Sequence, residues 1–158
     1  MRIKKLKIKE QRIHIEYEEK NKAEGWDEFS LTCAGEAAPS FYAALRSLAE
    51  HATELCELPQ EYVSRIKVKG VSFSYAGDKE TMGATIIATL FLNKSSTDLN
   101  LNTPHKIEAF YSGDSGDENQ LLPDECVHAL YTLIQECELY IQGKRIQGAL
   151  FKETTVEN

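Results

Sequence analysis

The stretch VKGVSFSYAGDKETMGATIIATLFL, residues 68 to 92, contains two apolar runs joined by a polar turn. In the first run Val71, Phe73 and Tyr75 alternate with small polar residues, which is typical of a strand with one buried face. The second run, residues 84 to 92, is almost continuously apolar and predicts a strand that is buried on both faces or central in a sheet. The turn is short, so we expect antiparallel pairing, with a bulge at Gly70 where the alternation changes phase.

Three strands are predicted before this hairpin and one after it. Apolar residues alternate over residues 3 to 8 and 13 to 17, which indicates a β-hairpin with an irregularity at Lys4 and Lys5. The alternation returns over residues 27 to 33. A further short strand is expected near residues 107 to 111, between two polar segments, 93 to 105 and 111 to 121, that are interpreted as loops.

Two stretches have apolar residues at spacings of three and four, the pattern of an amphipathic helix. The first follows Pro39 and ends before Pro59, and the second follows Pro123 and ends before Gly143. The sequence therefore predicts an α+β fold of order βββαβββα, in which two helices pack on one face of an antiparallel sheet of five or six strands. The residues that we expect to be buried together are Leu48, Ile87, Phe91, Leu130 and Ile134.

Length and composition favour one domain without export or membrane insertion. A chain of 158 residues suits a single core, which we assign to residues 1 to 143, with a tail over residues 144 to 158. No apolar run approaches the roughly 18 residues of a membrane span, and the N-terminus lacks the apolar core of a signal peptide. We therefore expect a cytoplasmic protein whose cysteines are reduced thiols. These cysteines are Cys33, Cys56, Cys126 and Cys137.

The sequence contains none of the familiar motifs for phosphate binding, zinc binding or nucleophilic catalysis. The histidines are scattered over separate predicted elements. Asp114, Asp117 and Glu118 offer oxygen ligands for a hard cation, but their spacing is not that of an EF-hand, and a solvated loop is the preferred interpretation. We expect no enzyme activity, no catalytic residue, no metal and no cofactor.

The charge distribution is uneven. A net charge of −7 opposes general affinity for nucleic acid, because such affinity depends on lysines and arginines that neutralise phosphates. Residues 2 to 12 are nevertheless basic, and Lys5, Lys7 and Lys9 are candidates for phosphate contact along one strand. In the alternative interpretation, which is favoured here, these lysines protect an edge strand against aggregation.

The segment Gln147-Gly148-Ala149-Leu150-Phe151 lies between a basic stretch and a polar tail. It resembles the bacterial sliding-clamp-binding motif, in which a glutamine, two variable residues and Leu-Phe occur in polymerases and other replication and repair proteins. The resemblance implies that Gln147, Leu150 and Phe151 bind an apolar pocket on the clamp. The alternative is that Leu150 and Phe151 pack back onto the protein's own sheet.

Residues 68 to 151 also resemble a class of uncharacterised proteins encoded in the early regions of phages and prophages, near recombination and replication genes. The quoted stretches are residues 68 to 92, LNLNTPHK, LLPDECVHAL and QGALF. The resemblance implies a phage origin, the cytoplasm of a bacterial host and a setting in DNA metabolism. It assigns no active site.

These observations lead to three hypotheses. The first is a non-enzymatic accessory protein of phage DNA replication or recombination, which binds the host sliding clamp through its tail. The second is a phage counter-defence protein that sequesters a host protein or a small nucleotide. The third is a cryptic hydrolase. The oligomeric state and the identity of the partner stay open.

Overall fold

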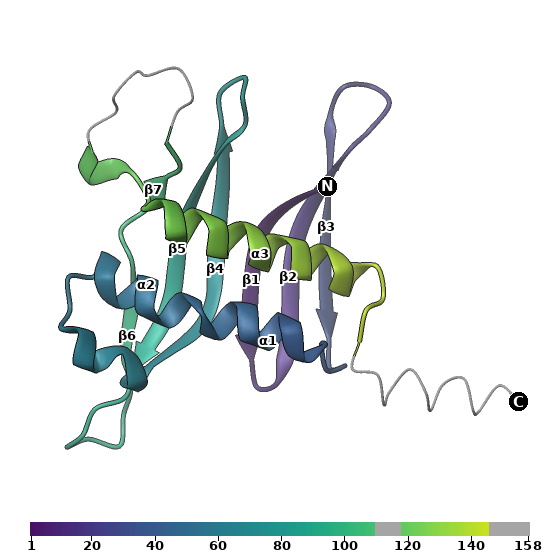
Figure 1. Cartoon of the computed structure of the whole chain (residues 1–158). Helices are drawn as coiled ribbons and strands as arrows, with labels where there is room; N and C mark the ends of the chain where they lie inside the picture. The colour runs from purple at the N-terminus through teal and green to yellow at the C-terminus, as the bar shows by residue number, and fades with distance from the viewer. Residues whose placement is uncertain (110–117, 146–158) are drawn as a thin grey trace, which may run out of the picture.

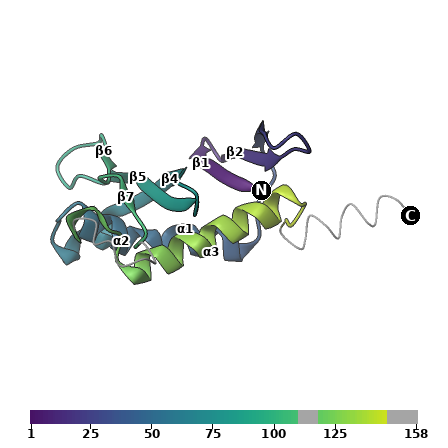
Figure 2. The same ribbon diagram turned by 90° about the horizontal axis from the view of Figure 1, so that it is seen from above.

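A computed structural model gives the structure of the protein, and it describes residues 1–109 and 118–145. In this part of the chain one antiparallel sheet lies behind three helices (Figure 1). Viewed from above, the helices all lie on the same side of the sheet and leave its other face open (Figure 2). The strands are β1 (Arg2–Lys9), β2 (Arg12–Lys20), β3 (Trp26–Cys33), β4 (Ile66–Ala76), β5 (Thr81–Leu90), β6 (Leu99–Asn102) and β7 (Lys106–Ile107).

The strands lie side by side in the order β3-β2-β1-β4-β5-β6, and β7 pairs with β5. Every one of these pairings is antiparallel, as expected for consecutive strands joined by short turns. The helices are α1 (Pro39–Arg46), α2 (Leu48–Leu55) and α3 (Asp124–Ile141), with 3-10 turns at Gln60–Arg65 and Glu118–Gln120. The predicted α+β class, with helices on one face of an antiparallel sheet, is confirmed.

The first predicted helix is divided into α1 and α2 at Ser47. The Ser47 hydroxyl donates a hydrogen bond to the carbonyl of Ala44, 2.7 Å away, within the preceding turn. A serine that bonds back to the preceding turn competes with the helical hydrogen bonds and often bends a helix. The sheet also exceeds the predicted five or six strands, because β6 forms inside the segment that was interpreted as a loop.

Both predicted irregularities in the strands are present. The pairing register shifts between Ile3 and Lys5 in β1, and again between Val68 and Gly70 in β4. Gly70 also lies directly against the Leu6 carbonyl, where a Cβ atom would collide with the backbone oxygen. Only glycine permits this close approach of β4 to β1.

The core lies between the sheet and the helices. Leu6 and Ile15 from the sheet, Leu48 from α2 and Leu130 from α3 are completely buried, and Ile134 is 9% exposed. The prediction was wrong for two other residues. Ile87 is only partly buried because it points toward the open face, where no helix covers it.

Phe91 is 58% exposed because it follows the last residue of β5. Within β5 the buried residues are those of the helix-facing phase, Ile86, Ala88 and Leu90. The continuous apolar run therefore predicted a central strand correctly. The other prediction from this run, burial on both faces, is wrong.

Candidate interaction surfaces

The open face of the sheet is mainly polar. Alternation places every second side chain of each strand on this face, and the residues that pair in register form rows across it. One row joins Thr32, His14 and Lys7, and leads through Gly70 to Ile87 and Asn102. A second row contains Ser30, Glu16, Lys5, Ser72 and Thr85.

Lys5, Lys7 and Lys9 all project from β1 onto this face, in alternation with Leu6 and Ile8. Strand β1 lies between β2 and β4, so it is an internal strand. The interpretation that these lysines protect an edge strand is therefore wrong. The ion pairs formed within the described residues include none of the three lysines.

Two further cations share this face, and the sequence reasoning did not select them. Arg12 pairs with Lys9 across the β1–β2 hairpin, and Lys67 projects from β4 opposite Thr89. Both side chains are exposed. The alternation phase of each strand was the available signal, because Arg12 alternates with Ile13 and Lys67 with Ile66 and Val68.

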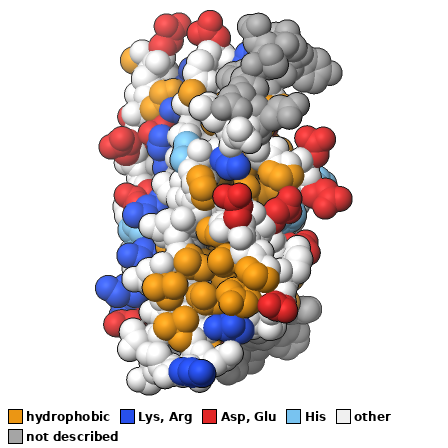
Figure 3. Space-filling view, turned by 90° about the vertical axis from the view of Figure 1, so that its left-hand side faces the viewer, with side chains coloured by type: hydrophobic (Ala, Val, Ile, Leu, Met, Phe, Trp, Pro, Cys, Tyr) orange, Lys and Arg blue, Asp and Glu red, His pale blue; other side chains and the backbone are white. Residues whose placement is uncertain are grey.

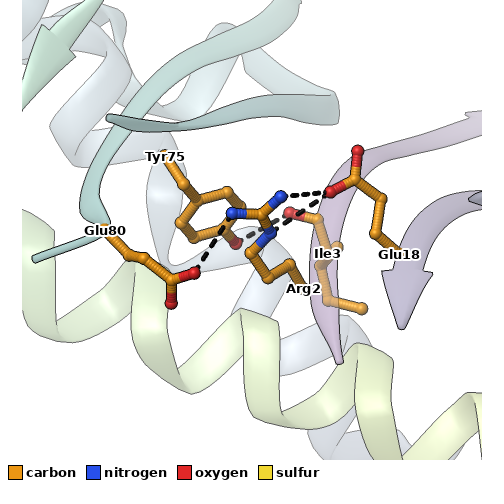
Figure 4. Close-up of polar contacts among 5 residues, drawn as sticks. All are labelled: Arg2, Ile3, Glu18, Tyr75 and Glu80. Atoms are coloured by element: carbon orange, nitrogen blue, oxygen red, sulfur yellow. Dashed lines mark hydrogen bonds and ion pairs between the residues drawn. The ribbon is translucent and has the colours of Figure 1, made fainter. Parts of the chain in front are cut away.

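Arg2 differs from the other basic residues of the N-terminal stretch because the carboxylates of Glu18 and Glu80 and the ring of Tyr75 surround it (Figure 4). Its guanidinium lies 2.5 Å from a carboxylate oxygen of Glu18 and 3.2 Å from one of Glu80. It also lies 3.6 Å from the centre of the Trp26 ring. Glu18 is 8% exposed, so Arg2 neutralises a buried carboxylate and holds β1, β2, β3 and the β4–β5 turn together.

His105 is the candidate base for the third hypothesis, a hydrolase. It follows β6 in the chain and lies over the open face. Its Nε2 atom is 2.8 Å from the Ser74 hydroxyl, and its Nδ1 atom is 2.9 Å from the Thr85 hydroxyl. Gly83 makes this possible, because a Cβ atom there would lie 2.6 Å from both His105 and Ser74. A serine nucleophile needs a histidine base, and a third group, usually a carboxylate, orients that base. Here the Thr85 hydroxyl occupies the position of the carboxylate.

Three of the four cysteine thiols are poor nucleophiles. Burial raises the pKa of Cys126 to about 11, and burial raises the pKa of Cys137 and Cys56 as well. The thiolate is the reactive form, so a raised pKa leaves little of it at neutral pH. Cys126 and Cys137 have no contact with solvent and belong to the core, as the sequence predicted.

A groove of about 930 Å³ opens on the helix side of the sheet, beside the β1–β2 turn. Its apolar lining includes Ile8, Leu45 and Val68. Its charged lining residues are Glu10, Glu36, Arg46, Lys67 and Lys69. Lys69 is the extra residue of the β4 bulge, so the bulge helps to shape this groove. Sequence reasoning did not select it, because its lining comes from three separate parts of the chain.

Several predicted site residues lie outside the described ranges. Gln147, Leu150 and Phe151 belong to residues 146–158, and Asp114 and Asp117 belong to residues 110–117. Among the residues that the structure describes, no group of three or more His, Cys, Asp or Glu side chains is placed to hold a metal ion. None of the described helices is long and apolar enough to cross a membrane.

Comparisons with protein-family models, with curated proteins and with solved structures find no match to this chain.

Proposed function

We propose that this chain is a non-enzymatic accessory protein of phage DNA replication or recombination, which binds the sliding clamp of a bacterial host through Gln147, Leu150 and Phe151. The observation that carries the proposal is the position of the QGALF segment in the sequence, two residues after Arg145, the last residue that the structure describes.

Helix α3 ends at Ile141, and Gly143 follows with a φ of +108°, in the left-handed region that favours glycine. Lys144 and Arg145 are then anchored on the domain. The Lys144 ammonium lies 3.5 Å from a Glu136 carboxylate oxygen. The Arg145 guanidinium lies 3.6 Å from the centre of the Tyr140 ring and donates a hydrogen bond to the Tyr140 carbonyl.

The hydrophobic core of the described residues is complete at this point. Tyr140 is its last fully buried member, and its hydroxyl donates a hydrogen bond to the Gly35 carbonyl, 2.7 Å away. Gln147 follows the anchored Arg145 by two residues. A linear motif is best presented from such a place, since the partner can take it up without unfolding the domain.

The experiment measures binding of purified bacterial clamp to the full chain and to a peptide of residues 144 to 158. We expect the peptide alone to bind with a dissociation constant of about 1 to 10 μM, because ordering a free peptide on binding offsets part of the contact energy. Replacing Leu150 and Phe151 by alanine should abolish binding and leave the thermal midpoint of the full chain unchanged.

A matched control keeps the same tail and the same number of substitutions. Thr154→Ala together with Thr155→Ala changes two tail residues outside the motif and should leave clamp binding intact. If the Leu150 and Phe151 substitutions lower the thermal midpoint by several degrees and the peptide does not bind, the segment is a structural anchor and the proposal fails.

The second candidate, a counter-defence protein, is supported by the groove beside the β1–β2 turn. Its apolar lining suits a base or an apolar side chain, and Arg46 and Lys69 suit a phosphate or carboxylate. Incubation with a host nucleotide extract, followed by mass spectrometry of what the protein retains, tests this function. Arg46→Ala with Lys69→Ala should abolish retention, whereas Lys22→Ala with Lys94→Ala, two exposed lysines elsewhere, should not.

A further inference from the structure

We propose that the open face of the sheet is a binding surface for the phosphodiester backbone of nucleic acid, with Lys5, Lys7, Lys9, Arg12 and Lys67 as its cationic contacts. This inference does not depend on the tail or on clamp binding. It rests on the position of β1 in the sheet, on the pairing of its neighbours, and on the separation of charge between the two sides of the molecule.

The first step concerns why lysines occupy an internal strand. Strand β1 has neighbours on both sides, so its lysines are not needed to prevent association at an edge. They stand at every second residue, about 6.6 Å apart at a rise of 3.3 Å per residue. Three lysines without ion-pair partners among the described residues therefore lie close together along one strand and repel one another. The fold itself does not require this arrangement.

The neighbours of Lys5, Lys7 and Lys9 on the adjacent strands add to the positive charge of this face. Lys7 lies in register with His14 on one side and Gly70 on the other, and Lys9 lies in register with Arg12. Strand β4 runs antiparallel to β1 with Lys7 opposite Gly70, so Lys67 lies at the same end of the sheet as Lys9. Glu16 is the acidic residue directly opposite Lys5, and its carboxylate is 3.6 Å from His14 rather than in an ion pair with the lysine.

The third step is the separation of charge across the molecule. In Figure 3 the open face lies along the left margin, where Lys and Arg side chains are interspersed with some Asp and Glu, and the helices lie on the right, where Asp and Glu predominate. The acidic residues of α2 and α3 are Glu50, Glu54, Asp124, Glu125, Glu136 and Glu138. These helical carboxylates lie on the covered side, away from Lys5, Lys7 and Lys9, whereas β2 and β3 place Glu16, Glu18 and Glu28 in the open-face phase beside the lysines.

The fourth step identifies the ligand by its chemistry. Protein interfaces depend on buried aromatic and apolar anchors, and the two rows that contain Lys5 and Lys7 offer only the half-buried Ile87, while Trp26 and Ile107 lie at the margins of the face. Hydroxyls and amides flank the cations instead, from Thr32, Ser72, Thr85 and Asn102. Lysines with neighbouring hydroxyl and amide groups are typical of contacts to phosphate oxygens, which position a nucleic acid without reading its sequence.

The test is fluorescence anisotropy of the full chain with labelled oligothymidylate and, separately, with a labelled duplex, between 50 and 200 mM salt. We expect weak binding that falls steeply with salt, with a logarithmic slope of about −3 for the single strand when four to five phosphates are neutralised. Binding to either form supports the proposal, and the form bound more tightly at equal phosphate is the ligand.

The decisive variant carries Lys7→Gln, Lys9→Gln and Lys67→Gln, three exposed side chains without packing roles. Its affinity at 50 mM salt should fall by about tenfold or more, and its salt slope should become shallower by about 2. The matched control carries Lys22→Gln, Lys79→Gln and Lys94→Gln, which remove the same charge from exposed loop positions. The control should keep both the affinity and the slope.

Three results would overturn the inference. The first is an absence of binding to both nucleic acids at 50 mM salt. The second is an equal loss in the control variant, which would mean that net charge matters and position does not. The third is competition by poly-glutamate as strong as competition by unlabelled oligonucleotide, which would make the surface a general polyanion or acidic-protein site.

Discussion

The helix-covered face and the open face of the sheet are built from the same strands, often from adjacent residues. In β1, Leu6 is completely buried against the helices, whereas its neighbour Lys7 is exposed on the other face. The covered face holds the fold together through apolar packing. The open face presents mainly polar and charged side chains, which lack this apolar packing.

The largest expected effect is truncation on the covered face. Leu6→Ala and Leu130→Ala should each lower the free energy of unfolding by about 2 to 5 kcal/mol, because each leaves a cavity in a core without solvent contact. Lys7→Ala, one residue from Leu6, should change it by less than about 0.5 kcal/mol. Urea unfolding measures all three. Equal losses from Leu6→Ala and Lys7→Ala would show that the two faces do not differ in this way.

A smaller loss of unfolding free energy is expected from replacing Arg2, a cation that stabilises the fold. Arg2→Ala removes both carboxylate pairs and the contact with Trp26, and it leaves the Glu18 carboxylate buried without its cation. We expect a loss of about 2 kcal/mol, since an unpaired buried charge is costly. Lys20→Ala, an exposed residue at the end of β2, is the matched control. If both variants unfold at the same urea concentration, Arg2 contributes nothing beyond a surface charge.

The covered face also predicts a response to alkaline pH. Burial raises the pKa of Cys126 from 9.0 to about 11, so this thiol stabilises the fold fully below pH 9 and loses its contribution as pH rises through 11. Between pH 8 and 10.5 the unfolding free energy of the wild type should therefore fall by about 2 kcal/mol more than that of Cys126→Ala. A difference of zero, or of the opposite sign, contradicts the burial of this thiol.

The smallest effect is expected from the lysines of β1 themselves. Two unit charges about 7 Å apart repel by only about 0.6 kcal/mol in water. Lys7→Gln with Lys9→Gln should therefore leave the thermal midpoint unchanged or raise it slightly, while it weakens any nucleic-acid binding. If the midpoint falls by several degrees, these lysines support the fold, and the contrast with Leu6 is weaker than we infer.

The sequence by itself determined most of the local structure. Period-two alternation located β1, β2, β3 and β4, and the changes of phase indicated the bulges before Lys5 and at Gly70. Stripes at spacings of three and four located the helices, and Gly143 marked the end of α3. These features depend on neighbours within a few residues, so the order of residue types is sufficient to predict them.

Only the tertiary structure decided which strand is internal and which face is covered. Short alternating runs are alike in edge and central strands, because the pairing partner lies far away in the sequence, so β1 was interpreted as an edge. The same limit explains the exposure of Ile87 and Phe91, since an apolar run does not show where helices stop covering a sheet. The groove at Arg46 and Lys69 and the contact between His105 and Ser74 likewise arise from long-range packing, which no local pattern encodes.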